Sequence, residues 1–342
     1  MAILSLKKIR SVDDNAMSEE LVSIIIPARN EEKNIEGIIK NLQNQTYENI
    51  EIIVANDASV DNTAALAISL GVEVVDAIEN EDSFPKPNAC HSGFLTSKGN
   101  IIVFLDADVR VSQNFIGCIV KEISTGKECI SYQPYHKRKN VFEELSLFFH
   151  IASVIGSGLF SLIPFNVGLY GPCIAMTKKV YEKTNGYNNK NVKQSIVEDI
   201  ALSNVMKEHN VDTSRSINKK IIQYRMYEKL PDLINGWRKN IARGAGAAPL
   251  IVVLSIVLFF GFLISATTNL LLGDDIVFNA ISLGISFFLL FLVARRVGDY
   301  LISIVFFPVS LLFFIGVFIL AIYDKAFKRD VRWKDRSLKW VS

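Results

Sequence analysis

The stretch IIVFLDAD, residues 101–108, constrains the fold more than any other part of the sequence. Five apolar residues are followed at once by two aspartates, Asp106 and Asp108, one residue apart. An apolar run of this length without polar alternation is typical of a strand that is covered on both faces. The acidic pair is therefore predicted to lie at the carboxyl end of a buried strand, where ligands bind in open α/β sheets.

Apolar runs of the same kind precede this stretch. Residues 22–27 (VSIIIP), 50–55 (IEIIVA) and 72–75 are predicted to be strands, and helix-like stretches at 31–45 and 61–70 separate them. Strands that alternate with helices are typical of an α/β sheet. We therefore predict a Rossmann-like domain with a mixed, mostly parallel sheet.

Polar residues follow three of the predicted strands, namely residues 29–31, Asn56 with Asp57, and Asp106 with Asp108. Because the carboxyl ends of parallel strands meet at one edge of the sheet, a single nucleotide crevice is expected there. Two carboxylates one residue apart can reach one hard cation, and Mg²⁺ or Mn²⁺ prefers oxygen ligands that it shares with phosphates. A turn-forming aspartate pair is the alternative interpretation.

Four blocks in this order resemble family 2 glycosyltransferases with a GT-A fold. They are VSIIIPARNEE at 22–32, NDASVDNT at 56–63, KPNA at 86–89 and FLDADV at 104–109. Four blocks in order are more specific than any one of them. Two later blocks extend the resemblance to about residue 245: YGPCIAMTKKVYEKTNGY is similar to the acceptor-side strand and turn, and IVEDIALS to the motif that supplies the catalytic base.

Within that family the chain looks most like bacterial carotenoid or terpenoid glycosyltransferases. The segments that carry this likeness are SYQPYH at 131–136, RMY at 225–227, GW at 236–237 and RRVG at 295–298. The likeness implies a lipophilic acceptor.

The resemblance also implies a UDP-sugar donor and a divalent metal ion. It places Asp57 at the uracil edge, Glu31 near the base and ribose, and Lys86 at the diphosphate. A turn role for Asp57 and a plain surface position for Lys86 are the alternatives. The implied donor-binding residues are Pro27, Arg29, Glu31, Asp57, Lys86, Asp106 and Arg243, and the implied metal ligands are Asp106 and Asp108.

Processive family members carry Gln-x-x-Arg-Trp after the base motif. The nearest fit here is residues 240–244 (NIARG), which lack both the glutamine and the tryptophan. Polymer synthesis is therefore disfavoured, and Arg243 is retained only as a diphosphate contact.

Asp199 is the predicted catalytic base. An inverting transfer needs a group that takes the proton of the acceptor hydroxyl as this attacks the sugar. The neighbouring Glu198 has another possible duty, because Ser195 and Glu198 have capping-box spacing at the start of an apolar helical run. Asp199 has no such duty, and we expect it to face the cleft from the helix start.

Composition divides the chain into two halves. The chain has 342 residues, 50% of them hydrophobic, and its mean hydropathy of +0.27 is high for a soluble protein. Residues 1–245 carry most of the charge and residues 249–323 carry very little. The formal net charge of +2 is too small to indicate a nucleic acid partner.

The chain has four cysteines and no CxxC pair. This fits reduced thiols in a cytoplasmic domain.

Three uncharged segments, 250–272, 276–294 and 300–323, are each long enough to cross a hydrocarbon core of about 30 Å. Arg295 and Arg296 follow the second segment, so the positive-inside rule predicts a multi-pass protein of the cell membrane with a cytoplasmic catalytic domain. Three spans would place the basic tail outside, against that rule. A re-entrant hairpin around Pro308 is the alternative.

Two further stretches are predicted to contact lipid. Residues 230–248 have the pattern of a basic amphipathic helix that lies at an interface. Residues 145–165 are strongly apolar but contain His150 and Pro164, which favours a lipid-facing or acceptor-binding helix over a span.

The predicted organisation is an N-terminal extension at 1–20, a catalytic domain at 21–229, an interface helix at 230–248, a transmembrane region at 249–323 and a basic tail at 324–342. The predicted activity is inverting transfer of a hexose, most simply glucose from UDP-glucose, to a lipophilic hydroxyl. The alternatives are a polyprenyl-phosphate glycosyltransferase and a non-catalytic membrane scaffold.

Overall fold

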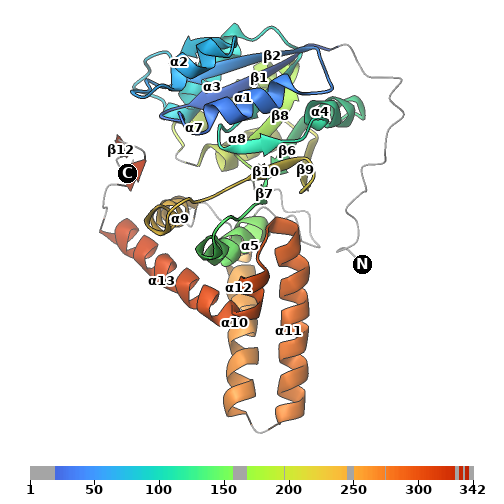
Figure 1. Cartoon of the computed structure of the whole chain (residues 1–342), viewed down its shortest axis with the longest axis vertical. Coiled ribbons are helices and arrows are strands. Elements are labelled where there is room, and N and C mark those ends of the chain that lie inside the picture. The colour runs from blue at the N-terminus through green and yellow to red at the C-terminus, as the bar shows by residue number, and fades with distance from the viewer. Residues whose placement is uncertain are drawn as a thin grey trace. The chain divides into compact units, whose positions relative to one another are not determined.

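The computed structural model describes residues 20–156, 168–195, 197–244, 250–273, 275–327, 331–333 and 336–338. The described residues form two compact units (Figure 1). The first unit contains the residues up to Pro134 together with 168–224, and the second contains 135–156 together with the residues from Arg225 onward. Residues 135–156, which the sequence places inside one continuous domain, thus group with the C-terminal helices. The predicted N-terminal extension lies almost wholly outside the described residues, as does part of the basic tail.

A seven-stranded sheet forms the centre of the first unit, in the order β3-β2-β1-β4-β8-β6-β9. The first four strands in this order are mutually parallel, β8 is antiparallel to both of its neighbours, and β9 is parallel to β6. The strands are β1 (Val22–Ala28), β2 (Ile50–Asn56), β3 (Glu73–Asp76), β4 (Ile101–Leu105), β6 (Cys129–Gln133), β8 (Cys173–Thr177) and β9 (Thr213–Ile217). The predicted mixed, mostly parallel sheet is confirmed, and its apolar strands form the core of this unit.

Helices connect these strands. They are α1 (Ile35–Gln43), α2 (Thr63–Ser69), α3 (Pro85–Thr96), α4 (Phe115–Ser124), α6 (Lys178–Thr184), α7 (Lys190–Lys193) and α8 (Glu198–Glu208), with the 3₁₀ turn η3 (Gly186–Asn188). A short strand β5 (Val109–Val111) pairs antiparallel with β10 (Ile222–Tyr224). Helix α1 begins four residues later than predicted, because the backbone N–H of Glu31 donates to Thr63 in the next loop. That loop holds the end of β1 against the end of β2.

The second unit is mostly helical. It contains β7 (Tyr135–His136), the 3₁₀ helix η2 (Val141–Ser146), α5 (Leu147–Gly156), α9 (Leu230–Gly244), α10 (Leu250–Leu272), α11 (Ile276–Val297), α12 (Leu301–Val305), α13 (Phe307–Ala326), and the strand pair β11 (Val331–Trp333) and β12 (Arg336–Leu338). Helices α10 and α11 lie side by side and are joined by a short loop (Figure 1).

Two helices among the described residues are long and apolar enough to cross a membrane, namely Ile276–Val297 and Phe307–Asp324. Within α10 the apolar stretch Ile256–Asn269 is shorter. The segment predicted at 300–323 is divided into α12 and α13 at Phe306. Pro308 is the second residue of α13, a position that tolerates proline because its missing N–H would have no partner inside the helix. Pro308 therefore starts a helix and does not interrupt one.

Helix α5 is a core element of the second unit. Four of its apolar side chains, Leu147, Phe148, Ile151 and Val154, are fully buried. The helix contacts α10, α11 and α13. The stretch was predicted to be a lipid-facing or acceptor-binding helix, and its described part is covered by protein. The apolar composition of a helix is the same whether lipid or protein surrounds it.

The apolar face of α9 is also covered by protein. Leu233 is fully buried, and the ring of Trp237 stacks on Phe149 with 4.7 Å between centroids. The indole N–H of Trp237 donates to Ser146 Oγ at 3.0 Å. Leu230, at the helix start, is exposed. The predicted amphipathic helix is present, and most of its apolar face packs against the second unit itself.

An ion pair fastens α9 to the end of α13. Arg238 Nε lies 2.9 Å from Asp324 Oδ2, and Arg238 Nη2 lies 2.7 Å from Asp324 Oδ1. Asp324 is buried and the Arg238 side chain is 30% exposed, so Arg238→Ala leaves a buried carboxylate without this partner. We expect a loss of about 1–3 kcal/mol, which corresponds to a melting temperature lower by roughly 3–8 °C. Scanning fluorimetry of the full chain in nanodiscs, with the exposed Lys229→Ala as control, measures this. Equal melting temperatures for the two variants would contradict a clamping role.

Candidate active site

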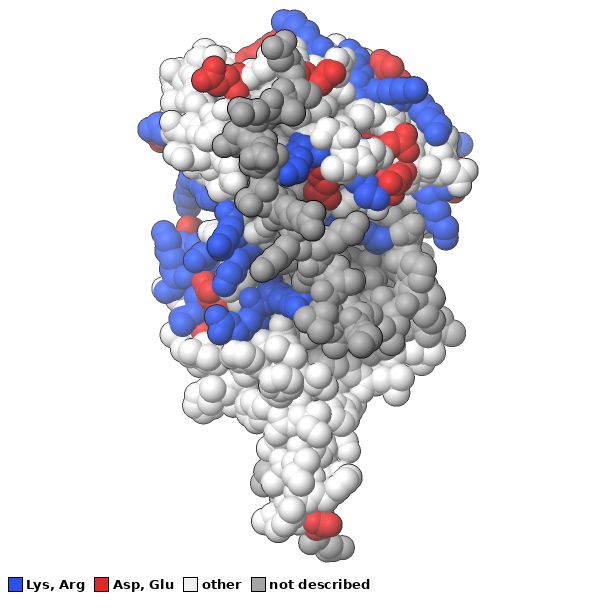
Figure 2. Space-filling view, turned by 90° about the vertical axis from the view of Figure 1, so that its right-hand side faces the viewer, with Lys and Arg blue, Asp and Glu red and all other residues white. Residues whose placement is uncertain are grey.

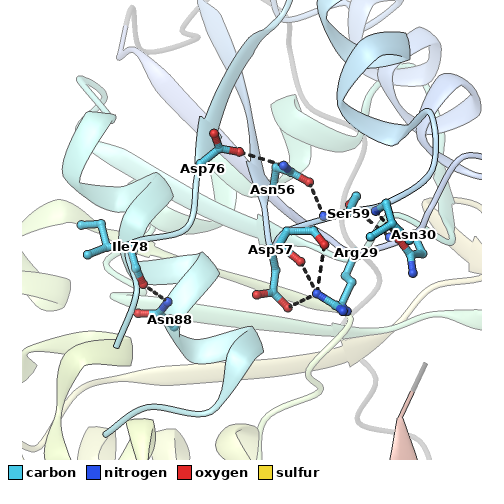
Figure 3. A network of polar contacts seen from close by, with 10 residues as sticks. Arg29, Asn30, Asn56, Asp57, Ser59, Asp76, Ile78 and Asn88 are labelled. Carbon is cyan, nitrogen blue, oxygen red and sulfur yellow. Dashed lines mark hydrogen bonds and ion pairs between the residues drawn. The ribbon is translucent and has the colours of Figure 1, made fainter. Parts of the chain in front are cut away.

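The ends of β1 and β2 meet through Arg29 and Asp57. Arg29 Nη1 donates to the Asp57 backbone carbonyl at 2.7 Å and to the Ala58 carbonyl at 3.1 Å. The same nitrogen lies 3.8 Å from Asp57 Oδ2 (Figure 3). Both residues are more than nine-tenths buried. The two predicted donor-binding residues are thus held together at the carboxyl edge of the sheet.

Amide side chains shape the loop after β2. Asn56 Oδ1 accepts from the Ser59 N–H at 3.1 Å, and Asn30 Oδ1 accepts from the Val60 N–H at 2.9 Å. Asn56 Nδ2 donates to Asp76 Oδ1 at 2.8 Å, which ties the ends of β2 and β3 together (Figure 3). Asn30 has a positive φ of 50°, which asparagine tolerates better than most residues. Hydrogen bonds within the protein therefore fix the conformation of this loop.

Lys86 bridges two carboxylates of this unit. Its Nζ lies 2.8 Å from Asp106 Oδ1 and 3.4 Å from Glu198 Oε1, and also 3.4 Å from the Gly171 carbonyl. Burial by itself would lower the pKa of Lys86, but Asp106 and Glu198 outweigh burial and raise it. Lys86 is therefore a fixed positive charge beside the acidic pair.

Asp199 lies in the first turn of α8, next to this ion pair. A Cβ atom added to Gly171 would lie 3.3 Å from Asp199 Oδ2 and 3.6 Å from Lys86 Nζ, so Gly171 adjoins both side chains. Burial, and next the charge of Glu198, raise the pKa of Asp199 to about 7 against the opposing effect of Lys86. A carboxyl group that titrates near neutrality can accept and release protons under cellular conditions.

The predicted capping box at the start of α8 is not formed. Val197 is the N-cap residue, with no side-chain cap hydrogen bond, and Ser195 Oγ instead accepts from the Val197 N–H. Ser195 and Glu198 have the spacing of a capping box, but Ser195 lies two residues before the N-cap residue. Glu198 is thereby available for Lys86.

Arg110 was missed by the sequence reasoning. Its guanidinium donates to the carbonyls of Val109 at 2.7 Å and of Asn34 at 3.3 Å. Burial lowers the pKa of Arg110, and the charges of Asp108 and Glu31 oppose that effect. Arg110 thus ties β5 to the residue before α1 and places a positive charge near Asp108. Its position two residues after Asp108 is a signal that could have found it.

A divalent ion would have two carboxylates here, Asp106 and Asp108. No group of three or more His, Cys, Asp or Glu side chains that could hold a metal occurs among the described residues. Mg²⁺ is commonly bound by one or two carboxylates together with substrate phosphates and water. A two-carboxylate site fits an ion that arrives with a nucleotide diphosphate.

Residues 23–184 match the profile of glycosyl transferase family 2. This chain contains a family 2 glycosyl transferase domain. It is 29% identical over 334 residues to the 4,4'-diaponeurosporenoate glycosyltransferase of Staphylococcus aureus (strain USA300), with 93% of this chain and 88% of the relative covered. The mannosyltransferase PcManGT from Pyrobaculum calidifontis, solved with GDP-Man and Mn²⁺, matches with a TM-score of 0.54 at 16% identity over 92% of each chain. The predicted GT-A fold is confirmed.

Most of the predicted site lies in the first unit, with the glycosyl transferase domain. The structure brings together Arg29 with Asp57, and Lys86 with Asp106 and the start of α8. Pro27 is within β1, where it is paired with Ala55. Asp199 lies beyond the residues that match the family profile. The side chain of Arg243 lies outside the described residues, and its predicted role stays a prediction.

Proposed function

We propose that the chain transfers a hexose, most simply glucose from UDP-glucose, to a lipophilic acceptor with inversion at the anomeric carbon. The observation that carries this is the group formed by Asp199, Lys86 and Asp106, in which a carboxyl with a pKa near 7 adjoins a fixed cation and an acidic pair. The relative from Staphylococcus aureus, whose name gives diaponeurosporenoate as its acceptor, supports a lipophilic acceptor.

The nucleotide is proposed to bind along the ends of β1 and β2. Asp57 would accept from the uracil N–H, and Arg29 would keep the Asp57 loop in place, while Pro27 and Glu31 would line the base and ribose. PcManGT, which was solved with GDP-Man, supports a nucleotide-sugar donor. The choice of uracil is our proposal for this chain, since a base edge is read by the few polar groups that reach it.

Asp106 and Asp108 are proposed to hold Mg²⁺ or Mn²⁺ together with the donor diphosphate. The Mn²⁺ in PcManGT supports this. Such an ion supplies Lewis acidity and neutralises charge on the departing nucleotide. Lys86 would add a second positive charge at the same place, because its Nζ is already within 2.8 Å of Asp106.

Asp199 is proposed to take the proton of an acceptor hydroxyl. The hydroxyl oxygen then forms a bond to the anomeric carbon, the bond from that carbon to the diphosphate oxygen breaks, and the nucleotide leaves. A second candidate is a carboxylate acceptor, which the name diaponeurosporenoate favours. A carboxylate is already ionised at pH 7 and gains little from a base, so the two candidates predict different roles for Asp199.

We propose that the protein lies in the cell membrane as a multi-pass protein with its catalytic domain in the cytoplasm. The residues between Asp275 and Arg295 carry no charge, and helix α11 is long enough to cross a bilayer. Arg295 and Arg296 in its last turn favour the cytoplasmic side.

Mass spectrometry of lipid extracts tests this function. Cells that express the full chain should contain a hexosylated lipid that cells without it lack, and the fragment masses should identify both sugar and acceptor. Cells with the Asp199→Asn chain at equal membrane abundance serve as the matched control and should contain far less of it, if the acceptor is a hydroxyl. An unchanged lipid profile, with the protein present in the membrane fraction, would refute the proposed transfer.

A further inference from the structure

Two basic segments of the second unit, far apart in the sequence, lie side by side in the fold. His136 forms a parallel β-bridge with Gly298, and the Asp299 N–H donates to the His136 carbonyl at 3.0 Å. These contacts place Lys137 and its two basic successors next to the end of α11. We call this set the basic surface; it consists of Lys137, Arg138, Lys139, Arg295 and Arg296.

Internal contacts fix the backbone of the basic surface. Arg138 Nε lies 2.7 Å from Glu144 Oε1, and the Lys139 N–H donates to Glu143 Oε2 at 2.8 Å. Tyr135 Oη donates to Asp299 Oδ1 at 2.9 Å. The segment is therefore held in place before any ligand arrives, which lowers the entropy cost of binding.

The acids near the basic surface are mostly engaged in the interior. Glu143 and Glu144 are buried, and Glu143 also pairs with Arg225 at 2.6 Å. Asp299 is partly exposed, with its Oδ2 3.8 Å from Lys137 Nζ, and the exposed Glu228 is paired with Arg225 at 2.9 Å. Lys137, Lys139 and Arg295 are themselves exposed. The outward charge is consequently positive.

The basic surface adjoins an apolar one. Arg295 lies with its guanidinium carbon 5.4 Å from the centroid of the Phe291 ring, one helical turn back along α11. Further along the helix Phe288, Ile285 and Ile281 are exposed. Residues 276–294 carry no charge and span about 29 Å at 1.5 Å per residue, close to the thickness of a hydrocarbon core. Figure 2 shows Lys and Arg side chains, with a few acidic ones among them, gathered above a largely uncharged helical surface that has an acidic group at its lower tip.

We propose that the basic surface binds anionic phospholipid headgroups at the edge of the bilayer. The uncharged length of α11 sets its last turn at headgroup depth, where an anionic leaflet attracts Lys and Arg side chains. A nucleic acid or acidic protein would not explain exposed phenylalanine and isoleucine directly beside the charges. The phospholipid bound by the basic surface is distinct from the acceptor that is glycosylated, so the inference goes beyond the proposed function.

Native mass spectrometry of the full chain in detergent tests the proposal. The chain is titrated with phosphatidylglycerol or phosphatidylcholine of equal acyl length. The wild type is expected to prefer phosphatidylglycerol about tenfold. The variant Lys137→Gln/Lys139→Gln/Arg295→Gln should lose that preference to within about twofold; it spares Arg138, which holds buried Glu144. The matched control is Lys207→Gln/Lys219→Gln/Lys220→Gln, which removes the same charge from exposed positions of the first unit and should keep the preference.

Three outcomes of the lipid titrations would overturn the proposal. They are a wild type without preference, a patch variant that keeps the wild-type preference, and a control that loses it as fully as the patch variant. Inorganic phosphate is added as a competitor in a further titration. Loss of the preference at millimolar phosphate would show a site for free phosphate in place of a lipid surface. None of these measurements uses sugar transfer, so a failure of the proposed enzymatic function would leave the result intact.

Discussion

Replacement of Asp199 by asparagine should lower the rate of sugar transfer about 10²–10⁴-fold if the acceptor is a hydroxyl. Asparagine has nearly the shape of aspartate but cannot accept the proton of the attacking group. Binding of UDP, measured by calorimetry on the same preparation, should stay within a few-fold of the wild type. Transfer and binding that both survive within a few-fold would show that no base is needed, and would make the carboxylate acceptor the better proposal.

The pH dependence of transfer gives this test a second readout. Below pH 7 the Asp199 carboxyl is mostly protonated and cannot act as a base, because burial and Glu198 raise its pKa to about 7. The wild-type rate should therefore rise with pH up to about 7 and then level off. Glu198→Gln is the matched control, since it removes the nearest negative charge and leaves Asp199 in place. Its rise should move to lower pH, whereas Asp199→Asn should lack the rise altogether.

The strands of the first unit could be predicted because their signals are local. The apolar runs at 22–27, 50–55 and 101–105 lie within one residue of β1, β2 and β4, and four ordered blocks identified the fold. The contacts among Lys86, Asp106 and Glu198 could not be predicted in the same way. They join side chains from three elements that are far apart in the sequence. No local pattern in any one of these segments indicates that the three side chains meet in the fold.

The second unit shows a different limit of sequence reasoning. An apolar helix can be covered by lipid or by protein, and its composition is the same in both cases. For this reason the stretch containing α5 was interpreted as a lipid-facing or acceptor-binding helix, although neighbouring helices bury its apolar side chains. The basic surface was missed because its halves, around Lys137 and Arg295, are joined only by the bridge between His136 and Gly298.

Asp108→Ala should abolish the effect of Mn²⁺ on UDP binding. In the wild type, Asp106 and Asp108 would hold the ion together with the nucleotide diphosphate, so Mn²⁺ should raise the affinity for UDP about 10²-fold or more. Without Asp108 the only remaining aspartate of the pair is Asp106, whose carboxylate is already occupied by Lys86 at 2.8 Å. Calorimetry with and without Mn²⁺ should then give affinities within a few-fold of each other.

A control variant distinguishes the loss of a metal ligand from a general loss of negative charge. Asp82→Ala removes an exposed carboxylate shortly before α3 and should keep the full response to Mn²⁺. Lys86→Ala removes the cation that competes for Asp106, so Mn²⁺ alone should bind more tightly. In the absence of metal, UDP should bind more weakly to this variant. If Asp108→Ala responded to Mn²⁺ as the wild type does, the ion would be held elsewhere. In that case Asp106 would serve as the ion-pair partner of Lys86, a structural role for which the 2.8 Å contact between them is enough.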